Sequence, residues 1–188
     1  LPILVVNGET VAEKAYTADR SEPLVFDFSD KVVDRKNKVE IIRTEGAGAP
    51  VPYSVGIRFR TEKPATSPEV PVSLSTELAK EKLAMGGTVR LTATVENTTD
   101  EGLGMALARV GLPGGLTFQQ WQLEELQDNG KVGFIETRKR EVILYFRDMK
   151  PGGSKEVPLE LKAFVPGKFT GQASRSYLYY NNDTKHWT

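Results

Sequence analysis

The chain of 188 residues carries 25 basic and 25 acidic side chains, one histidine and no cysteine. The absence of cysteine excludes disulfides, cysteine nucleophiles and thiolate metal sites, and a single histidine excludes multi-histidine metal sites. A net charge of zero gives no electrostatic basis for binding nucleic acid, and no apolar run approaches the ~20 residues of a membrane-spanning helix. We therefore expect a globular chain without a cofactor, without a nucleic-acid partner and without a membrane span in this fragment.

The first third of the chain contains short apolar runs typical of strands. Leu1–Val6 opens directly in such a run with no methionine and no signal peptide, which we interpret as a strand that begins at a cut. Further strands are predicted at 24–28 and 39–43. Residues 53–60 alternate cleanly and predict another strand with one apolar face, formed by Tyr53, Val55, Ile57 and Phe59.

The stretch 61–68 is the best candidate for a linker. It is polar, contains two prolines and has no apolar periodicity. We therefore expect two domains, residues 1–63 and residues 64–188.

The second region has the more regular strand pattern. In 88–96 the residues Val89, Leu91, Ala93 and Val95 share one face, and polar side chains share the other. Further strands are predicted at 70–78, 105–110, 141–146, 157–164 and 174–180. This spacing predicts a mainly β protein, an antiparallel sandwich of about seven strands preceded by a partial β domain.

One segment, 117–130, breaks the strand period and predicts a helix of two to three turns. Thr117 and Gln120 have the spacing of a capping box, and Asn129–Gly130 is a plausible left-handed end. The predicted apolar stripe consists of Phe118, Trp121, Leu123 and Leu126.

No set of residues in the sequence assembles a catalytic or metal-binding constellation. His186 is the sole imidazole, and no serine elbow accompanies it. The carboxylates Asp27 and Asp30 lack the spacing of a calcium loop, and 181–184 is predicted to be a hairpin turn. We expect a binding or assembly module and no enzyme.

Five stretches of the second region resemble one family in order. They are 71–76, 89–97, 102–116, 142–148 and 177–183, with the predicted helix following Gly-Leu-Pro-Gly-Gly. Together they resemble the receptor-binding-type macroglobulin domain, an immunoglobulin-like sandwich with one short helix, at the C-terminus of the alpha-2-macroglobulin family. The likeness is greatest to large bacterial members. Residues 1–63 are similar to the second half of the CUB-like β domain that precedes it.

The resemblance implies a non-catalytic module of a secreted, extracellular or periplasmic protease-trapping protein, an endopeptidase inhibitor. In this family the terminal domain packs against a helical thioester domain, shields its thioester from water and contacts other macroglobulin domains. Proteinases are then indirect partners. A Cys-Gly-Glu-Gln motif in the adjoining upstream sequence would confirm this interpretation, and its absence would indicate a non-thioester relative.

The candidate docking residues lie in two stretches of the sequence. The first stretch is the predicted helix, with Trp121, Glu124 and Glu125. The second contains Tyr177, Tyr179 and Tyr180, which are candidates for thioester shielding. Animal members use helix lysines for receptor uptake, whereas 118–128 holds no lysine or arginine, so that role is not carried over.

A second hypothesis is a generic immunoglobulin-like adhesion or carbohydrate-binding module. Such a module stacks sugars on exposed aromatic rings, and Trp121 and Trp187 are the residues that would form the platform. Burial of both rings would remove the best candidates for sugar binding.

Overall fold

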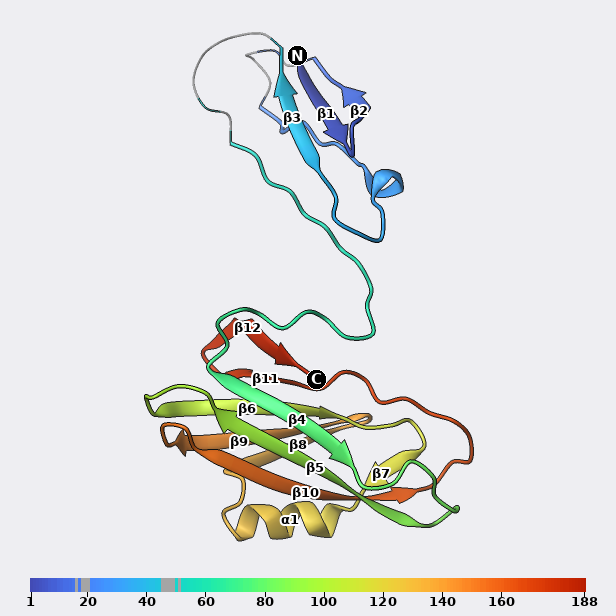
Figure 1. Ribbon diagram of the computed structural model, residues 1–188, viewed down its shortest axis with the longest axis vertical. Helices are drawn as coiled ribbons and strands as arrows, with labels where there is room; N and C mark the ends of the chain where they lie inside the picture. The colour runs from blue at the N-terminus through green and yellow to red at the C-terminus, as the bar shows by residue number, and fades with distance from the viewer. Residues whose placement is uncertain (16, 18–20, 45–49, 51) are drawn as a thin grey trace. The chain divides into compact units, whose positions relative to one another are not determined.

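A computed structural model describes residues 1–15, 17, 21–44, 50 and 52–188 of the chain. The chain divides into two compact units, Leu1–Ile57 and Arg58–Thr188. The first contains a small three-stranded sheet, and the second contains two packed sheets and one helix (Figure 1).

The first unit is built on an antiparallel sheet in the order β2-β1-β3. Its strands are β1 (Pro2–Val6), β2 (Glu9–Glu13) and β3 (Val39–Arg43), with a short 3-10 helix at Ser29–Lys31. Asn7 and Gly8 join β1 to β2 with positive φ values of 54° and 88°, a conformation that asparagine and glycine tolerate best. Among the described residues of this unit, only the apolar side chains of Leu4 and Val6 are buried.

Two strands predicted for this part of the chain are absent. Residues 24–28 and 53–60 are described and have no regular structure. Val25 is 69% exposed, and Tyr53 and Phe59 are 77% and 78% exposed. An alternating pattern makes a segment suitable for a sheet. A strand forms, however, only when the backbone N–H and C=O groups of the segment bond to those of a neighbouring strand. No such neighbour lies beside either segment in the described part of the chain.

The second unit is an antiparallel β-sandwich, which confirms the predicted fold class. One sheet has the order β4-β5-β10-β7, formed by Val72–Leu78, Thr88–Asn97, Ser154–Ala163 and Leu116–Phe118. The other has the order β12-β11-β6-β9-β8, formed by Asn181–Trp187, Arg175–Leu178, Leu103–Gly111, Glu141–Met149 and Phe134–Arg138. The described residues therefore contain nine strands here, of which β7, β8 and β12 were not predicted.

The core lies between these two sheets. Val89, Leu91, Ala93 and Val95 are all buried, as the alternation in this strand predicted. They face Ala106, Ala108, Val110, Val142, Leu144 and Phe146 from the five-stranded sheet. The outer side of the five-stranded sheet carries polar and aromatic side chains together with the buried aliphatic side chains of Leu107 and Ile143.

The helix α1 is Gln120–Asp128, shorter than the predicted segment. The predicted capping box is wrong: Thr117 lies in β7, and the N-cap is Gln119, with no side-chain cap hydrogen bond. Strand pairing with Lys162 of β10 holds Thr117 in extended backbone, which places it outside the helix. The predicted end is confirmed, since Gly130 has a φ of 67° just beyond the last turn.

The helix covers the exposed edge of β10, and this explains a buried glutamine. Because β7 pairs only with residues 161–163, the backbone of Pro158 and Glu160 lacks a strand partner on that side. The Gln122 amide donates to the Pro158 carbonyl at 2.7 Å and accepts from the Glu160 N–H at 3.3 Å. Gln122 thus occupies the buried face with Leu123 and Leu126, while Trp121 is 60% exposed and was wrongly placed in the apolar stripe.

The opposite side of the sandwich is closed by hydrogen bonds between β4 and the β11–β12 pair. The Ser176 hydroxyl donates to the Val72 carbonyl at 2.8 Å, and the Leu74 N–H donates to His186 Nδ1 at 3.3 Å. These contacts join the edges of the two sheets.

Part of the predicted linker is bound to the same edge. The Ser67 N–H donates to the Lys185 carbonyl at 2.9 Å, and the Lys185 N–H donates to the Ser67 hydroxyl at 3.0 Å. The Trp187 N–H donates to the Thr66 hydroxyl at 3.0 Å. Residues 66 and 67 therefore act as a short additional edge to β12 and belong to the second unit.

The hairpin that joins β11 to β12 turns at Tyr179 and Tyr180. The prediction of a turn at 181–184 is wrong, because these residues begin β12, with Asn181 paired to Leu178. The two tyrosines rather than the asparagines therefore form the tip.

Gly111 and Gly104 lie in the same strand, β6, and offer a matched test of packing. A Cβ on Gly111 would lie 2.0 Å from the backbone carbonyl oxygen of Gln172, whereas nothing lies within 4 Å of a Cβ on Gly104. We expect Gly111→Ala to lower the free energy of unfolding by about 1–3 kcal/mol, as overpacking does, and Gly104→Ala to lower it by less than about 0.5 kcal/mol. Urea denaturation of both variants measures this; equal losses would contradict the close approach.

Candidate functional site

His186, the one histidine of the sequence, serves a structural role in the second unit. Its Nδ1 accepts the Leu74 N–H, so the neutral ring carries its proton on Nε2. Burial, together with the positive charge of Lys63, lowers the pKa of His186 below its ordinary value. A ring held this way supports the closure of the sandwich and has no nucleophile paired with it.

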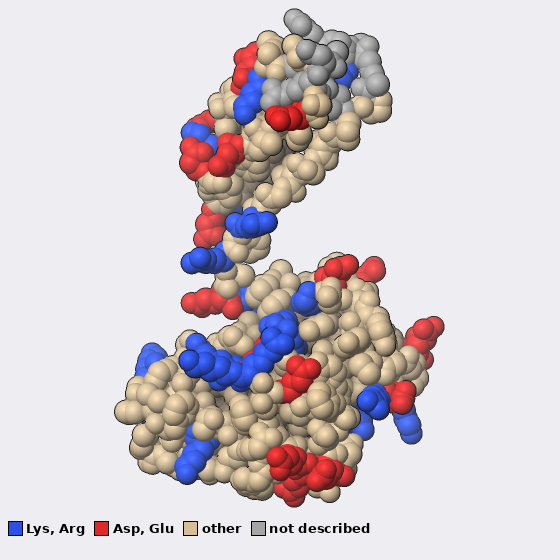
Figure 2. All heavy atoms as spheres, turned by 180° about the vertical axis from the view of Figure 1, so that it is seen from behind, with Lys and Arg blue, Asp and Glu red and all other residues tan. Residues whose placement is uncertain are grey.

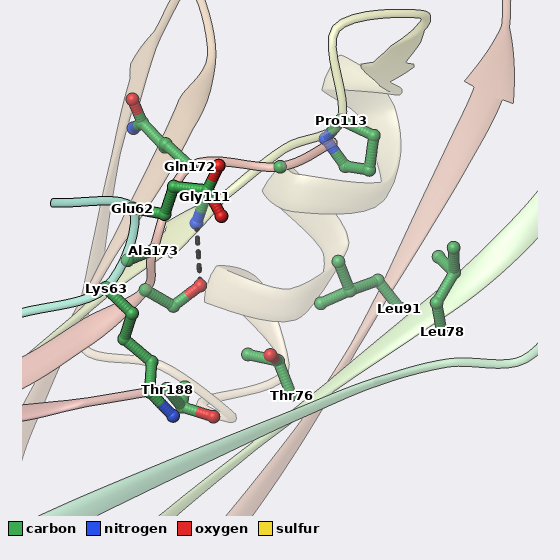
Figure 3. Close-up of a pocket in the computed structure, with 12 residues that line it drawn as sticks. Glu62, Lys63, Thr76, Leu78, Leu91, Gly111, Pro113, Gln172, Ala173 and Thr188 are labelled. Atoms are coloured by element: carbon green, nitrogen blue, oxygen red, sulfur yellow. Dashed lines mark hydrogen bonds between the residues drawn. The ribbon is translucent and has the colours of Figure 1, made fainter. Parts of the chain in front are cut away.

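A cavity of about 320 Å³ lies at one end of the sandwich (Figure 3). Thr76, Leu78 and Leu91 line one side, and Gly111 and the segment 171–174 line another. The Gly111 N–H donates to the Ser174 hydroxyl at 3.0 Å, so both groups are already engaged. Glu62 and Lys63 are the charged groups of the described lining, and they do not combine with a nucleophile.

The described residues contain no cluster of three or more histidine, aspartate or glutamate side chains able to hold a metal ion. Within the same ranges, no helix combines the length and apolar character needed to cross a bilayer.

The outer face of the five-stranded sheet is the most distinctive surface of the second unit. It is formed by the outward-pointing side chains of β12, β11, β6, β9 and β8. Aromatic rings meet across it: Phe134 and Tyr145 have centroids 5.6 Å apart, Tyr145 and Tyr179 6.4 Å, and Tyr179 and Tyr180 4.9 Å. The Tyr145 hydroxyl donates to Glu136 at 2.7 Å, and burial together with this bond raises the pKa of Tyr145 to about 12.

A buried carboxylate lies on the same face between two arginines. Glu141 has a side chain only 6% exposed, and Arg109 binds it through both Nε, at 3.0 Å, and Nη2. Arg175 approaches the same carboxylate, with its Nη1 3.3 Å from Glu141 Oε1. The Arg175 guanidinium also lies 5.1 Å from the ring centroid of Trp187, a cation–π contact.

The pKa values of the two arginines shift in opposite directions. The hydrogen bond to Glu141 raises the pKa of Arg109. Burial and then the charge of Arg109 lower the pKa of Arg175. Both remain charged near neutral pH because guanidinium groups hold their protons so strongly. The cluster therefore contains two positive charges and one negative charge.

Charge is unevenly distributed over the second unit. Basic side chains of the outer face are Arg109, Arg138, Arg147, Arg175 and Lys185, against the acidic Glu136 and Glu141. Figure 2 shows Lys and Arg gathered in a band across this unit, and acidic side chains gathered at the end where α1 lies. The chain is neutral as a whole, so a local excess of one sign of charge is offset elsewhere in the molecule.

The predicted docking residues come from two separate elements. Trp121, Glu124 and Glu125 are exposed on α1, which packs against β10 and β8. Tyr177 lies on β11, with Tyr179 and Tyr180 at the tip of the following turn, 49% and 88% exposed. In the five-stranded sheet β12 and β8 are opposite edges, so the two groups lie on opposite sides of the sandwich (Figure 1).

The sequence analysis missed three residues of the outer face, Arg109, Glu141 and Arg175, and named Trp187 only as a candidate sugar platform. They are distant in the sequence and become neighbours through strand pairing, in which Arg175 is opposite both Arg109 and Trp187. The only available signal was the position of each on the polar side of an alternating strand. Trp187, the other candidate sugar platform, is half-buried against Arg175.

Part of the second unit matches a known protein family. Residues 101–188 match the family model of the A-macroglobulin receptor binding domain. No curated protein sequence matches the chain.

Solved structures of two bacterial alpha-2-macroglobulins share the fold. Salmonella alpha-2-macroglobulin reacted with methylamine matches 66% of this chain at 16% identity, with a TM-score of 0.52. Trypsin-activated alpha-2-macroglobulin from Escherichia coli matches 66% at 15% identity, with a TM-score of 0.53. The chain covers only 9% and 10% of those proteins.

Arg109, Glu141 and Arg175 together form what we call the Glu141 cluster, and we expect it to contribute strongly to stability. Glu141→Gln removes the carboxylate charge and leaves two largely buried guanidiniums facing each other, which we expect to lower the free energy of unfolding by about 3 kcal/mol. The control Glu160→Gln breaks the exposed pair with Arg90 on the other sheet and should change it by less than about 1 kcal/mol. Chemical denaturation compares the two; similar small effects would show that the cluster is well solvated.

His186 should make stability depend on pH. Its pKa is lower in the folded chain, so between that value and the unfolded value of about 6.5 the unfolded chain binds more protons. Stability is therefore fully present above about pH 6.5 and declines as pH falls through the folded pKa. We expect the Tm to fall between pH 7.5 and pH 5.5, and His186→Gln, whose amide oxygen can replace the acceptor, to reduce that fall. An unchanged pH dependence in the variant would contradict this role.

Proposed function

We propose that the chain is the non-catalytic C-terminal module of an alpha-2-macroglobulin-like protease-trapping protein, because residues 101–188 match the family model of the A-macroglobulin receptor binding domain. In this role the module docks on the thioester domain of its parent chain, shields the thioester from water, and contacts other macroglobulin domains. The family match carries the proposal. Proteinases are then met by the whole protein, in an extracellular or periplasmic location.

The treatments applied to the two structural relatives support this proposal. One alpha-2-macroglobulin was reacted with methylamine, and the other was activated by trypsin. An amine and a proteinase are the reagents expected for a protein that holds a thioester and responds to cleavage. Because the fold is shared, we propose that the present chain is likewise one part of a larger multidomain protein.

We assign the first unit to the second half of a CUB-like domain. Its sheet has three strands, its described residues bury little apolar surface, and Ile41 and Ile42 are 47% and 44% exposed. The extended segment 53–60 exposes a further row of apolar side chains. Both features are those expected of a sheet whose other strands come from elsewhere in a parent protein, and on this basis we propose that the CUB-like part comprises residues 1–63.

The tyrosine tip of the β11–β12 hairpin is the part of the module best suited to shielding. Tyr180 is 88% exposed, and its ring packs edge-on against Tyr179. The Tyr179 N–H donates to the Met105 carbonyl at 3.1 Å, which anchors the turn to β6. A fixed pair of rings can cover a reactive ester and exclude water without the entropy cost of ordering a mobile loop.

The shielding role predicts the behaviour of Tyr180→Ala in the parent protein. Hydrolysis of the thioester releases a free thiol, and we expect the variant to release it at least about fivefold faster, the effect of losing about 1 kcal/mol of ring packing. A thiol-specific chromogenic reagent measures the rate in the native protein. Met85→Ala, which removes a similarly exposed side chain (63%) from the loop before β5, should leave the rate unchanged.

Two outcomes would contradict the proposal. A parent protein that releases no thiol after mild hydrolysis has no thioester for the module to shield. Equal rates for Tyr180→Ala and the unaltered protein would show that this tip does not cover the thioester.

A further inference from the structure

The Glu141 cluster contains two positive charges, on Arg109 and Arg175, and only one negative charge, on Glu141. The side chains of Arg109 and Arg175 are only 20% and 18% exposed, so neither is fully hydrated. Removing a charge from water is costly unless an opposite charge replaces the lost hydration. Because Arg109 already engages both oxygens of Glu141, Arg175 has the weaker pairing and the greater capacity for a second carboxylate.

The groups around this cluster are those that favour protein contacts. Trp187 lies against Arg175, and Lys185 lies 5.7 Å from the ring centroid of Tyr177. The ring series from Phe134 to Tyr180 continues the surface toward the hairpin tip. Tryptophan, tyrosine and arginine are the residues that contribute most to binding at protein interfaces.

We propose that the outer face of the five-stranded sheet binds an acidic polypeptide segment. One carboxylate of that segment pairs with Arg175 beside Arg109, and its apolar side chains pack on Trp187 and the adjoining tyrosine rings. The excess of basic over acidic groups on this face supplies the complementary charge. This inference deepens the proposed docking function by naming a surface and the chemistry of the partner.

An acidic polypeptide fits this face better than a nucleic acid. A phosphate backbone carries a negative charge at every nucleotide, and the chain as a whole has no net positive charge to match it. A peptide carboxylate, in contrast, needs only one two-armed contact with a guanidinium and brings apolar neighbours for the rings.

The test uses the whole chain with two synthetic peptides. One is a capped heptapeptide that alternates leucine and glutamate, and the other replaces each glutamate with glutamine. The chain contains two tryptophans, so Trp121→Phe leaves Trp187 as the single fluorescent reporter. We expect the acidic peptide to change Trp187 emission and to shift backbone amide NMR signals of β11, β6 and β9. The glutamine peptide should bind at least about fivefold more weakly, as expected for a lost charged hydrogen bond.

Arg175→Gln and Arg90→Gln are the matched pair of variants. Arg175→Gln leaves the two-armed Arg109–Glu141 pair intact and neutral, so the fold should be retained, and acidic-peptide affinity should fall at least about fivefold. Arg90→Gln removes the same charge from the four-stranded sheet and should leave affinity unchanged. Thermal unfolding of both variants verifies that they are folded.

Four results would overturn the inference: no response to the acidic peptide, equal affinity for both peptides, shifts confined to α1 or the cavity, or tighter binding of a short DNA duplex to this face. The peptide assay contains no thioester domain. A positive peptide result with unchanged thiol release in Tyr180→Ala would therefore reject the shielding function alone, and the reverse combination would reject this surface alone.

Discussion

The backbone groups at the edges of two packed sheets must find hydrogen-bond partners, and the second unit is organised around this constraint. On one side, β7 is too short to cover β10, and Gln122 of α1 completes the ladder with its side-chain amide. On the other side, Ser176 and His186 join the sheets, while Thr66 and Ser67 extend β12. Unsatisfied backbone groups at these edges would favour pairing with other chains.

These closures determine which surfaces remain available. Because Gln122, Leu123 and Leu126 face inward, Glu124 and Glu125 face outward, and the helix presents an acidic surface. Because β11 and β12 are held against β4, their outward side chains extend the five-stranded sheet, and the hairpin tip presents two tyrosines. One end of the sandwich is therefore acidic (Figure 2), while the outer face of the five-stranded sheet carries an excess of basic side chains together with aromatic rings.

The local sequence pattern predicted correctly those elements whose burial follows from alternation along the chain. Val89 to Val95 alternate and are buried as expected, and Gly130 ends the helix as expected. The failures share one cause, which is that the deciding partner lies elsewhere. Residues 53–60 alternate but have no adjacent strand, and Thr117 is drawn into a strand by β10. Trp121 was assigned to a buried stripe that a glutamine occupies, because the demand for that glutamine comes from the edge of β10.

The sequence by itself determined that the chain is mainly β with a single helix, that it has no thiolate or multi-histidine chemistry, and that its second part resembles a macroglobulin domain. Composition and alternation are local properties, and burial of alternate side chains follows from them directly. Only the tertiary structure decided that Arg109, Glu141, Arg175 and Trp187 form one cluster, since strand pairing brings together residues from four strands. It also decided that the two predicted groups of docking residues lie on opposite sides, because sheet order is set by hydrogen bonds between distant segments.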